Sequence, residues 1–214
     1  MSAAPVTTTP RATASSSAIT APDLPAEATT AVVIGSGFSA LAVAAELNRQ
    51  GVKAIMVDSF CPVKQSSPPP TTGGISLDAL SERSEVVRLL ENYARRHDLD
   101  IRPETQALEL TRAGHTLPAD HPWLIHTATG VLNAHSVVFT RAALIQLRHV
   151  LHSVGVTTAA DMRTGMHALG LYLVGVGDLA IPTTAEILHQ AKRAGQSIAA
   201  RVVSREVSSA LALA

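Results

Sequence analysis

A glycine-rich turn between an apolar run and an alanine-rich run constrains the fold of this 214-residue chain most. AVVIG (31–35) predicts a buried strand, and the SGFSALAVAAELNRQG that follows predicts a helix that ends at Gly51. VKAIMVD (52–58) predicts a second buried strand. Together these three segments predict a βαβ unit with a right-handed crossover.

The turn also has the spacing of a dinucleotide-binding fingerprint, GxGxxA. Gly35 permits a tight turn, Gly37 leaves room for a pyrophosphate against the backbone, and Ala40 lets the helix pack close to the sheet. The N-terminus of the helix offers unpaired N–H groups to phosphate. Asp58, at the end of the second strand, would bind ribose hydroxyls and repel a 2′-phosphate. We therefore expect FAD or NAD rather than NADP, and a glycine turn that binds nothing is the alternative.

The rest of the chain predicts an open, mainly parallel sheet with helices on its faces and a small antiparallel piece. A helix is expected at about 82–97, with Val86, Leu89, Leu90 and Tyr93 on one face. Thr183 and Glu186 have capping-box spacing at the start of the last helix. The other expected elements are strands at 99–102, 106–110, 123–127, 131–135, 136–140 and 171–178, and helices at 142–154 and 184–203.

The two ends of the chain lack the periodic apolar pattern of the middle. Residues 1–30 are mostly Ala, Thr, Ser and Pro, which predicts a disordered tail. We expect a single domain at 31–205 and a flexible C-terminus at 206–214. The tail lacks the apolar segment of a secretory signal, and a transit peptide is the alternative reading.

Composition excludes several classes of function. The net charge is zero and aromatic residues make up 3%, so we expect no nucleic-acid partner. No run approaches the roughly 18 apolar residues that span a bilayer, so no membrane association is expected. One cysteine and nine scattered histidines give no metal site and no disulfide, so no metal is expected. The single cysteine favours a reducing, cytoplasmic setting.

Four stretches resemble one known family. VVIGSGFSALAVAAELNRQGVKAIMVD is similar to the N-terminal FAD-binding segment of the flavoprotein pyridine-nucleotide oxidoreductases and flavin-containing monooxygenases. LLENYARRHDLDIRPETQALEL, the region 107–138 and GLYLVGVGDLAIPTTAEILHQAKRAGQSIA resemble later elements of that domain, so the likeness covers about 31–203. It implies an α/β, Rossmann-like FAD-binding fold with a mainly parallel sheet and a three-stranded antiparallel meander. It also implies FAD rather than NAD.

The resemblance implies where the cofactor would bind. Gly177 and Asp178 become contacts of the ribityl–phosphate part, Ala107 lies by the adenine, and the last helix points its N-terminus at the flavin ring. The expected cofactor-binding residues are Gly35, Ser36, Gly37, Phe38, Ser39, Ala40, Asp58, Ser59, Ala107, Gly177 and Asp178.

The chain departs from the family in two places. The interval 142–170 holds no second glycine-rich unit for NAD(P)H, and Thr140-Arg141-Ala142 stands where relatives read Ala-Thr-Gly. No catalytic residue emerges from the sequence. Three functions stay open: an FAD-dependent oxidoreductase or FAD-carrying component, an NAD-binding dehydrogenase or sensor, and a non-catalytic relic that acts through protein interaction. A homodimer or a partner reductase is compatible with each.

Overall fold

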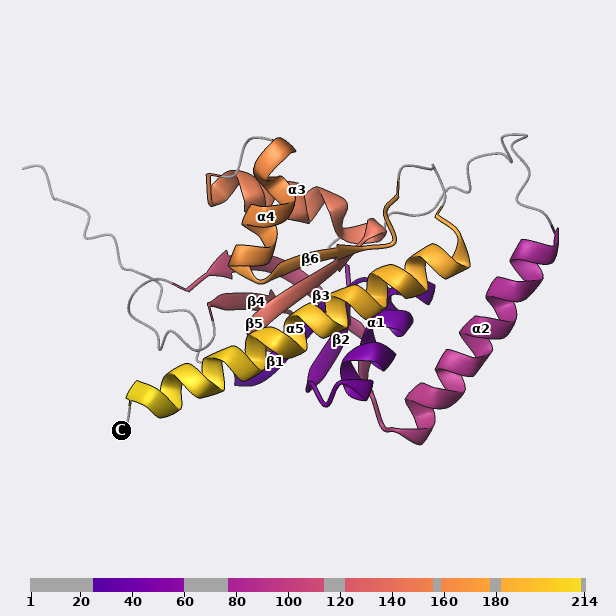
Figure 1. Ribbon diagram of the computed structural model, residues 1–214, viewed down its shortest axis with the longest axis horizontal. Coiled ribbons are helices and arrows are strands. Elements are labelled where there is room, and N and C mark those ends of the chain that lie inside the picture. The colour runs from indigo at the N-terminus through magenta and orange to yellow at the C-terminus, as the bar shows by residue number, and fades with distance from the viewer. Residues whose placement is uncertain (1–24, 60–76, 114–121, 156–158, 178–181, 213–214) are drawn as a thin grey trace, which may run out of the picture.

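The computed structural model describes residues 25–59, 77–113, 122–155, 159–177 and 182–212 (Figure 1). In chain order these form β1 (Ala26–Ile34), α1 (Phe38–Arg49), β2 (Ala54–Asp58), α2 (Leu77–Arg96), β3 (Asp100–Arg112), β4 (Trp123–Thr127), β5 (Val131–Thr140), a 3-10 turn (Arg141–Ala143), α3 (Leu144–Ser153), α4 (Ala159–Leu169), β6 (Leu171–Val174) and α5 (Thr184–Ala212). The α/β class is confirmed. The sequence reading does not predict α4, whose Thr164 and Gly165 lower its helix propensity.

The six strands belong to one sheet. β1 pairs parallel with β2 and with β5, β2 pairs parallel with the start of β3, and β6 pairs parallel with β5. β4 pairs antiparallel with both β3 and β5. Because β1 also pairs with β5, the pairings from β1 through β5 close into a ring, with β6 attached beside β5.

The closed ring corrects the expectation of an open sheet, because the antiparallel pairings of β4 with β3 and β5 are part of the ring. The segments 100–102 and 106–110, expected within two strands, lie in one strand, β3, whereas residue 99 precedes it. The segments 131–135 and 136–140 both lie in β5. Register shifts at Val57/Asp58 and Ala107/Glu109 interrupt the pairing of β3. Bulges and strand twist let a long strand leave one neighbour and join another, so both β3 and β5 have parallel and antiparallel partners.

Both ends of the ordered region extend further than expected. β1 begins at Ala26 because residues 26–29 pair with 131–134 of β5, so the last five residues of the expected tail form strand. α5 continues to Ala212, through most of the expected flexible C-terminus. Arg201 helps to hold α5 in place by donating to the backbone oxygens of His167 and Ala168, both at 2.9 Å. Residues 1–24 lie outside the described residues.

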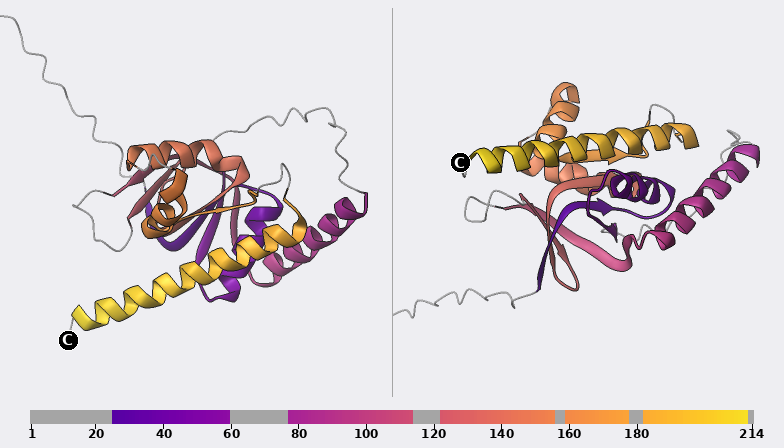
Figure 2. Two further views of the ribbon diagram at one scale, coloured as in Figure 1. Left: turned by 45° about the horizontal axis from the view of Figure 1, so that its top comes forward. Right: turned by 60° about the horizontal axis from the view of Figure 1, so that its bottom comes forward.

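The core has two layers, one on each face of the strands. Alternate residues of β1 enter different clusters: Ala31 and Val33 pack with α1 and α5, whereas Val32 and Ile34 pack with the antiparallel strands and α3. The left view of Figure 2 shows α3 and α5 on opposite sides of the strands. Burial on both faces explains why these parallel strands are continuously apolar.

Helix α2 packs mainly on α1 and, to a smaller extent, on α5. Both figures show it extending away from the body of the molecule (Figures 1 and 2). Leu89, expected on its buried face, is 67% exposed, whereas Ala94 is buried. Asn48 Nδ2 donates to the Tyr93 hydroxyl at 3.1 Å, which joins α2 to α1. Because α2 packs on helices rather than on the sheet, it covers only a narrow apolar face.

Candidate functional site

The turn after β1 requires glycine at its first position. The Gly35 N–H donates to Val57 O of β2 at 2.9 Å, and φ is +134°. A Cβ on Gly35 would lie 1.8 Å from Oγ1 of Thr140, and that hydroxyl donates to Ile34 O at 3.2 Å. The end of β5 therefore packs directly on the turn. Thr140, which departs from the family pattern, contacts the turn itself, and sequence reasoning did not place it there.

The second glycine has the opposite surroundings. Gly37 is the N-cap of α1 and has φ +79°; apart from its chain neighbours, no heavy atom of the described residues lies within 4 Å of the position of a Cβ. No side chain caps α1 and its first turn holds no acidic residue. Ser36 and Gly37 are both exposed. The first N–H groups of α1 have no partner within the helix, and the helix begins at an exposed, uncapped residue, which suits an anion.

Asp58 lies beside this turn, at the end of the neighbouring strand. Its Oδ1 accepts the Ser59 N–H at 2.8 Å, and the residue is partly exposed. On the far side of β2, Asp58 pairs with Gln106, so the fully buried Ala107 comes next along β3. The structure thus brings Gly35, Asp58 and Ala107 to adjacent positions across three strands. A dinucleotide lying across the carboxyl ends of β1 and β2 would pass Gly35 and Asp58 and then reach the middle of β3 at Ala107.

The first turn of α1 also contacts the end of β6. A Cβ on Gly175, at φ +82°, would lie 2.5 Å from Ser39 Oγ. The Ser39 side chain therefore faces protein rather than an open site. Gly175 N–H donates to Gln190 Oε1, and Gln190 Nε2 donates to Val176 O, both at 2.8 Å. Gln190 thereby holds the first two residues after β6 in place. In the sequence, Gly175 is the one sign of this contact.

The predicted cofactor contact at Gly177 lies against a carboxylate. A Cβ on Gly177 would lie 2.3 Å from Glu186 Oε1. The Glu186 N–H donates to Thr183 Oγ1 at 3.2 Å, so Thr183 caps α5 as its spacing predicted. An acidic residue in the first turn of a helix complements the helix dipole. The positive charge that we expected α5 to offer to a ligand is therefore partly neutralised by the chain. Asp178 lies outside the described residues.

A cation that the sequence reading did not identify lies beside the glycine turn. Cζ of Arg83, in α2, is 5.5 Å from the ring centroid of Phe38, the first residue of α1. Arg83 Nη2 also donates to Pro182 O, two residues before α5, at 2.8 Å. Pro182 is 99 residues from Arg83 in the sequence, so no local sequence pattern could reveal this contact.

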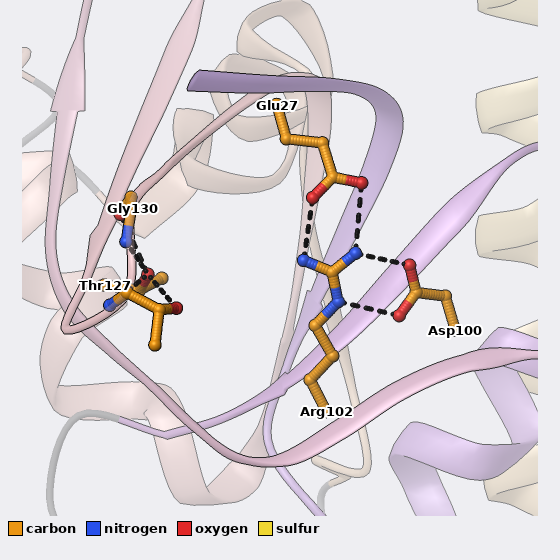
Figure 3. Close-up of polar contacts among 6 residues, drawn as sticks. Glu27, Asp100, Arg102, Thr127 and Gly130 are labelled. Atoms are coloured by element: carbon orange, nitrogen blue, oxygen red, sulfur yellow. Dashed lines mark hydrogen bonds and ion pairs between the residues drawn. The ribbon is translucent and has the colours of Figure 1, made fainter. Parts of the chain in front are cut away.

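The main ionic cluster lies at the other end of β1. Arg102 donates to both carboxylate oxygens of Glu27, at 2.8 and 3.0 Å, and to those of Asp100, at 2.8 and 2.6 Å (Figure 3). The hydrogen bond from Arg102 lowers the pKa of Glu27, and the two carboxylates raise that of Arg102. Because Glu27 lies near the start of β1 and Gly35 follows its end, this cluster braces strands rather than the site.

Two further classes of site are not found in the described part of the chain. No group of three or more His, Cys, Asp or Glu residues is arranged to hold a metal ion there. Its helices are too short or too polar to cross a bilayer.

No protein-family model and no curated protein matches the chain. Solved structures of partly similar shape include a bacillithiol disulfide reductase from Staphylococcus aureus (17% identity, 53% of this chain and 38% of that chain, TM-score 0.38). They also include a flavin monooxygenase from Stenotrophomonas maltophilia (20%, 53% and 38%, TM-score 0.35) and a ferredoxin–flavin thioredoxin reductase from Clostridium acetobutylicum (16%, 53% and 37%, TM-score 0.36). The chain thus spans well under half the length of each protein. At these TM-scores the likeness carries no conclusion about the function of this chain.

Proposed function

We propose that this chain binds FAD across the carboxyl ends of β1 and β2, and that it is an FAD-dependent oxidoreductase or its FAD-carrying component. The observation that carries the proposal is the start of α1: it has no cap, no acidic residue in its first turn and open space at Gly37. Asp58 ends the next strand, where a ribose would lie. A glycine turn with only a structural role would not need this open, uncapped helix end.

The residues fit different parts of the cofactor unequally. The backbone at Ser36 and Gly37 would hold the pyrophosphate, Asp58 would accept hydrogen bonds from ribose hydroxyls, and the β3 backbone at Ala107 would flank the adenine. Gly177 fits a phosphate poorly, because Glu186 lies against it. FAD when bound supplies hydride or electron transfer, while the protein supplies binding, orientation and electrostatics. The reducing electrons would come from the substrate, a transiently bound nicotinamide or a partner reductase.

NAD is the second candidate, because the same turn and the same carboxylate at Asp58 suit its adenosine half. A non-catalytic relic is the third. The packing of Thr140 on Gly35 favours it, since the β5 end lies against the turn that a cofactor would approach. Under that alternative the chain would act through a homodimer or another protein partner.

The decisive experiment is the visible absorption spectrum of freshly purified protein, followed by heat release and chromatography of any nucleotide. FAD binding predicts a flavin spectrum and released FAD, or colour gained by titration of the apoprotein with FAD. Binding of NAD alone in calorimetric titration would replace FAD by the second candidate. If the protein folds cooperatively but binds neither FAD nor NAD, the third candidate, a non-catalytic relic, remains.

A further inference from the structure

Arg83 occupies an unusual position between two helix N-termini. Its guanidinium lies over the ring of Phe38 at the start of α1 and donates to Pro182 O just before α5. Within the described residues, Pro182 O is the hydrogen-bond acceptor that Arg83 uses, and it forms no ion pair. An arginine has five N–H donors, so most of those of Arg83 have no acceptor among the residues that the structure describes.

The electrostatics of this position favour an added anion. A helix N-terminus carries about half a positive charge, and a cation placed there is disfavoured. Glu186 offsets this charge at α5, but the first turn of α1 has no acidic residue. The partial positive charge of the helix dipole is therefore uncompensated at the start of α1, where Arg83 adds a full positive charge beside Phe38. A diphosphate bound at Gly37 would complement both the helix end and the guanidinium.

We propose that Arg83 is a further ligand of the dinucleotide pyrophosphate, carried to the glycine turn by α2. This inference rests on the proposed function and adds a residue to its binding site. On binding, the guanidinium exchanges its contact with the neutral Phe38 ring for charge-assisted hydrogen bonds to phosphate oxygens, which are stronger. Arg83 belongs to no glycine motif, and only the tertiary contact brings it to the turn.

The same contact couples the nucleotide to α2. α2 is attached to the body through α1 and α5, with Leu80 and Leu89 exposed. A ligand that binds Arg83 holds the N-terminal half of α2 against the turn, so binding should slow backbone exchange in α2. By linkage, if nucleotide binding stabilises the attachment of α2 by some factor, loss of that attachment lowers the affinity for the nucleotide by the same factor.

The test uses the full chain with Arg83→Ala, and with Arg88→Ala as the matched control. Arg88 is an exposed arginine on the same helix, so its removal changes net charge equally without touching the turn. FAD is the probe, with affinity measured by flavin fluorescence and α2 followed by hydrogen exchange with and without FAD. We expect Arg83→Ala to weaken FAD binding at least about tenfold and Arg88→Ala to leave it within twofold. FAD should slow exchange in α2 of the parent and of Arg88→Ala, but not of Arg83→Ala.

The outcomes separate this inference from the proposed function. If the parent binds FAD and Arg83→Ala binds it as tightly as Arg88→Ala does, the proposal is overturned and the FAD site stands. An Arg83→Ala variant that speeds α2 exchange without changing FAD affinity likewise overturns it, because Arg83 would then only brace the helix. A parent that binds no FAD defeats the proposed function and this inference with it. Arg83→Lys keeps the charge but not the planar donors, so it should lie between parent and Arg83→Ala.

Discussion

Helices α1 and α5 both begin after a glycine loop that follows a parallel strand, yet their N-termini differ. The α1 end has no side-chain cap, no acidic residue in its first turn and open space at Gly37. The α5 end is capped by Thr183 and carries Glu186 against Gly177, and Gln190 binds the backbone of Gly175 and Val176 after β6.

The comparison shows that a helix N-terminus is available to a ligand only where the chain leaves its donors unsatisfied. At α5 the protein's own oxygen atoms already take the place that an anion would occupy. At α1 that place is open. The phosphate site that we propose is therefore at α1 and not at α5, although both helices follow a strand and a glycine.

The largest effect is expected from Gly37→Val, which should abolish FAD retention. The valine would fill the open space and would also be strained at φ +79°. Gly51→Val is the matched control, because Gly51 has φ +73° and equally open surroundings at the other end of α1. Absorbance of the purified variants measures retained flavin. If Gly37→Val retains flavin, or if both variants lose it equally, the start of α1 is not the phosphate site.

Asp58→Ala should weaken FAD binding by about 1–3 kcal/mol, the scale of a hydrogen bond to a charged group. The cause is the loss of the acceptor at the end of β2, and the effect should not extend to folding. Calorimetric titration measures the affinity, and Glu104→Ala, an exposed carboxylate of β3, serves as control. Equal affinity of the two variants would remove Asp58 from the site.

Glu186→Gln tests the α5 side of the comparison. The change removes the negative charge beside Gly177 and keeps a side chain of nearly the same shape. If Glu186 only shields α5, FAD should bind more tightly by about 0.3–1 kcal/mol, and the gain should shrink with added salt. Titration at two ionic strengths measures both quantities. Weaker binding would instead make the Glu186 carboxylate a cofactor contact.

The smallest effect concerns the ionic cluster at the start of β1. Because the folded pKa of Glu27 is lowered from 4.5, its stabilising contribution is present above that value and is lost as pH falls through the lowered pKa. Glu27→Gln should cost about 1 kcal/mol or less at neutral pH, since the Glu27 side chain is 42% exposed. Denaturant unfolding between pH 3 and about 7 measures this. An unchanged FAD affinity in this variant would separate stability from the α1 site.

The local pattern of the chain was sufficient for the first βαβ unit and the glycine turn. Apolar runs around Gly35, Gly37 and Asp58 encode strand, turn and strand end within about thirty residues, and the structure places all three as predicted. The Thr183 cap of α5 is also local, because its donor lies three residues away.

The tertiary structure alone decided the rest. The closed ring depends on β1 pairing with β5, about a hundred residues later in the chain, and Leu89 is exposed because α2 meets helices rather than the sheet. Thr140 on Gly35, Glu186 on Gly177 and Arg83 at Phe38 are likewise contacts between distant segments. Sequence periodicity reports which face of an element is apolar, but not what the finished fold brings against it. The sequence therefore determined that a glycine turn of GxGxxA spacing joins β1 to α1, and long-range packing decided that the start of α5 is covered by the chain's own side chains.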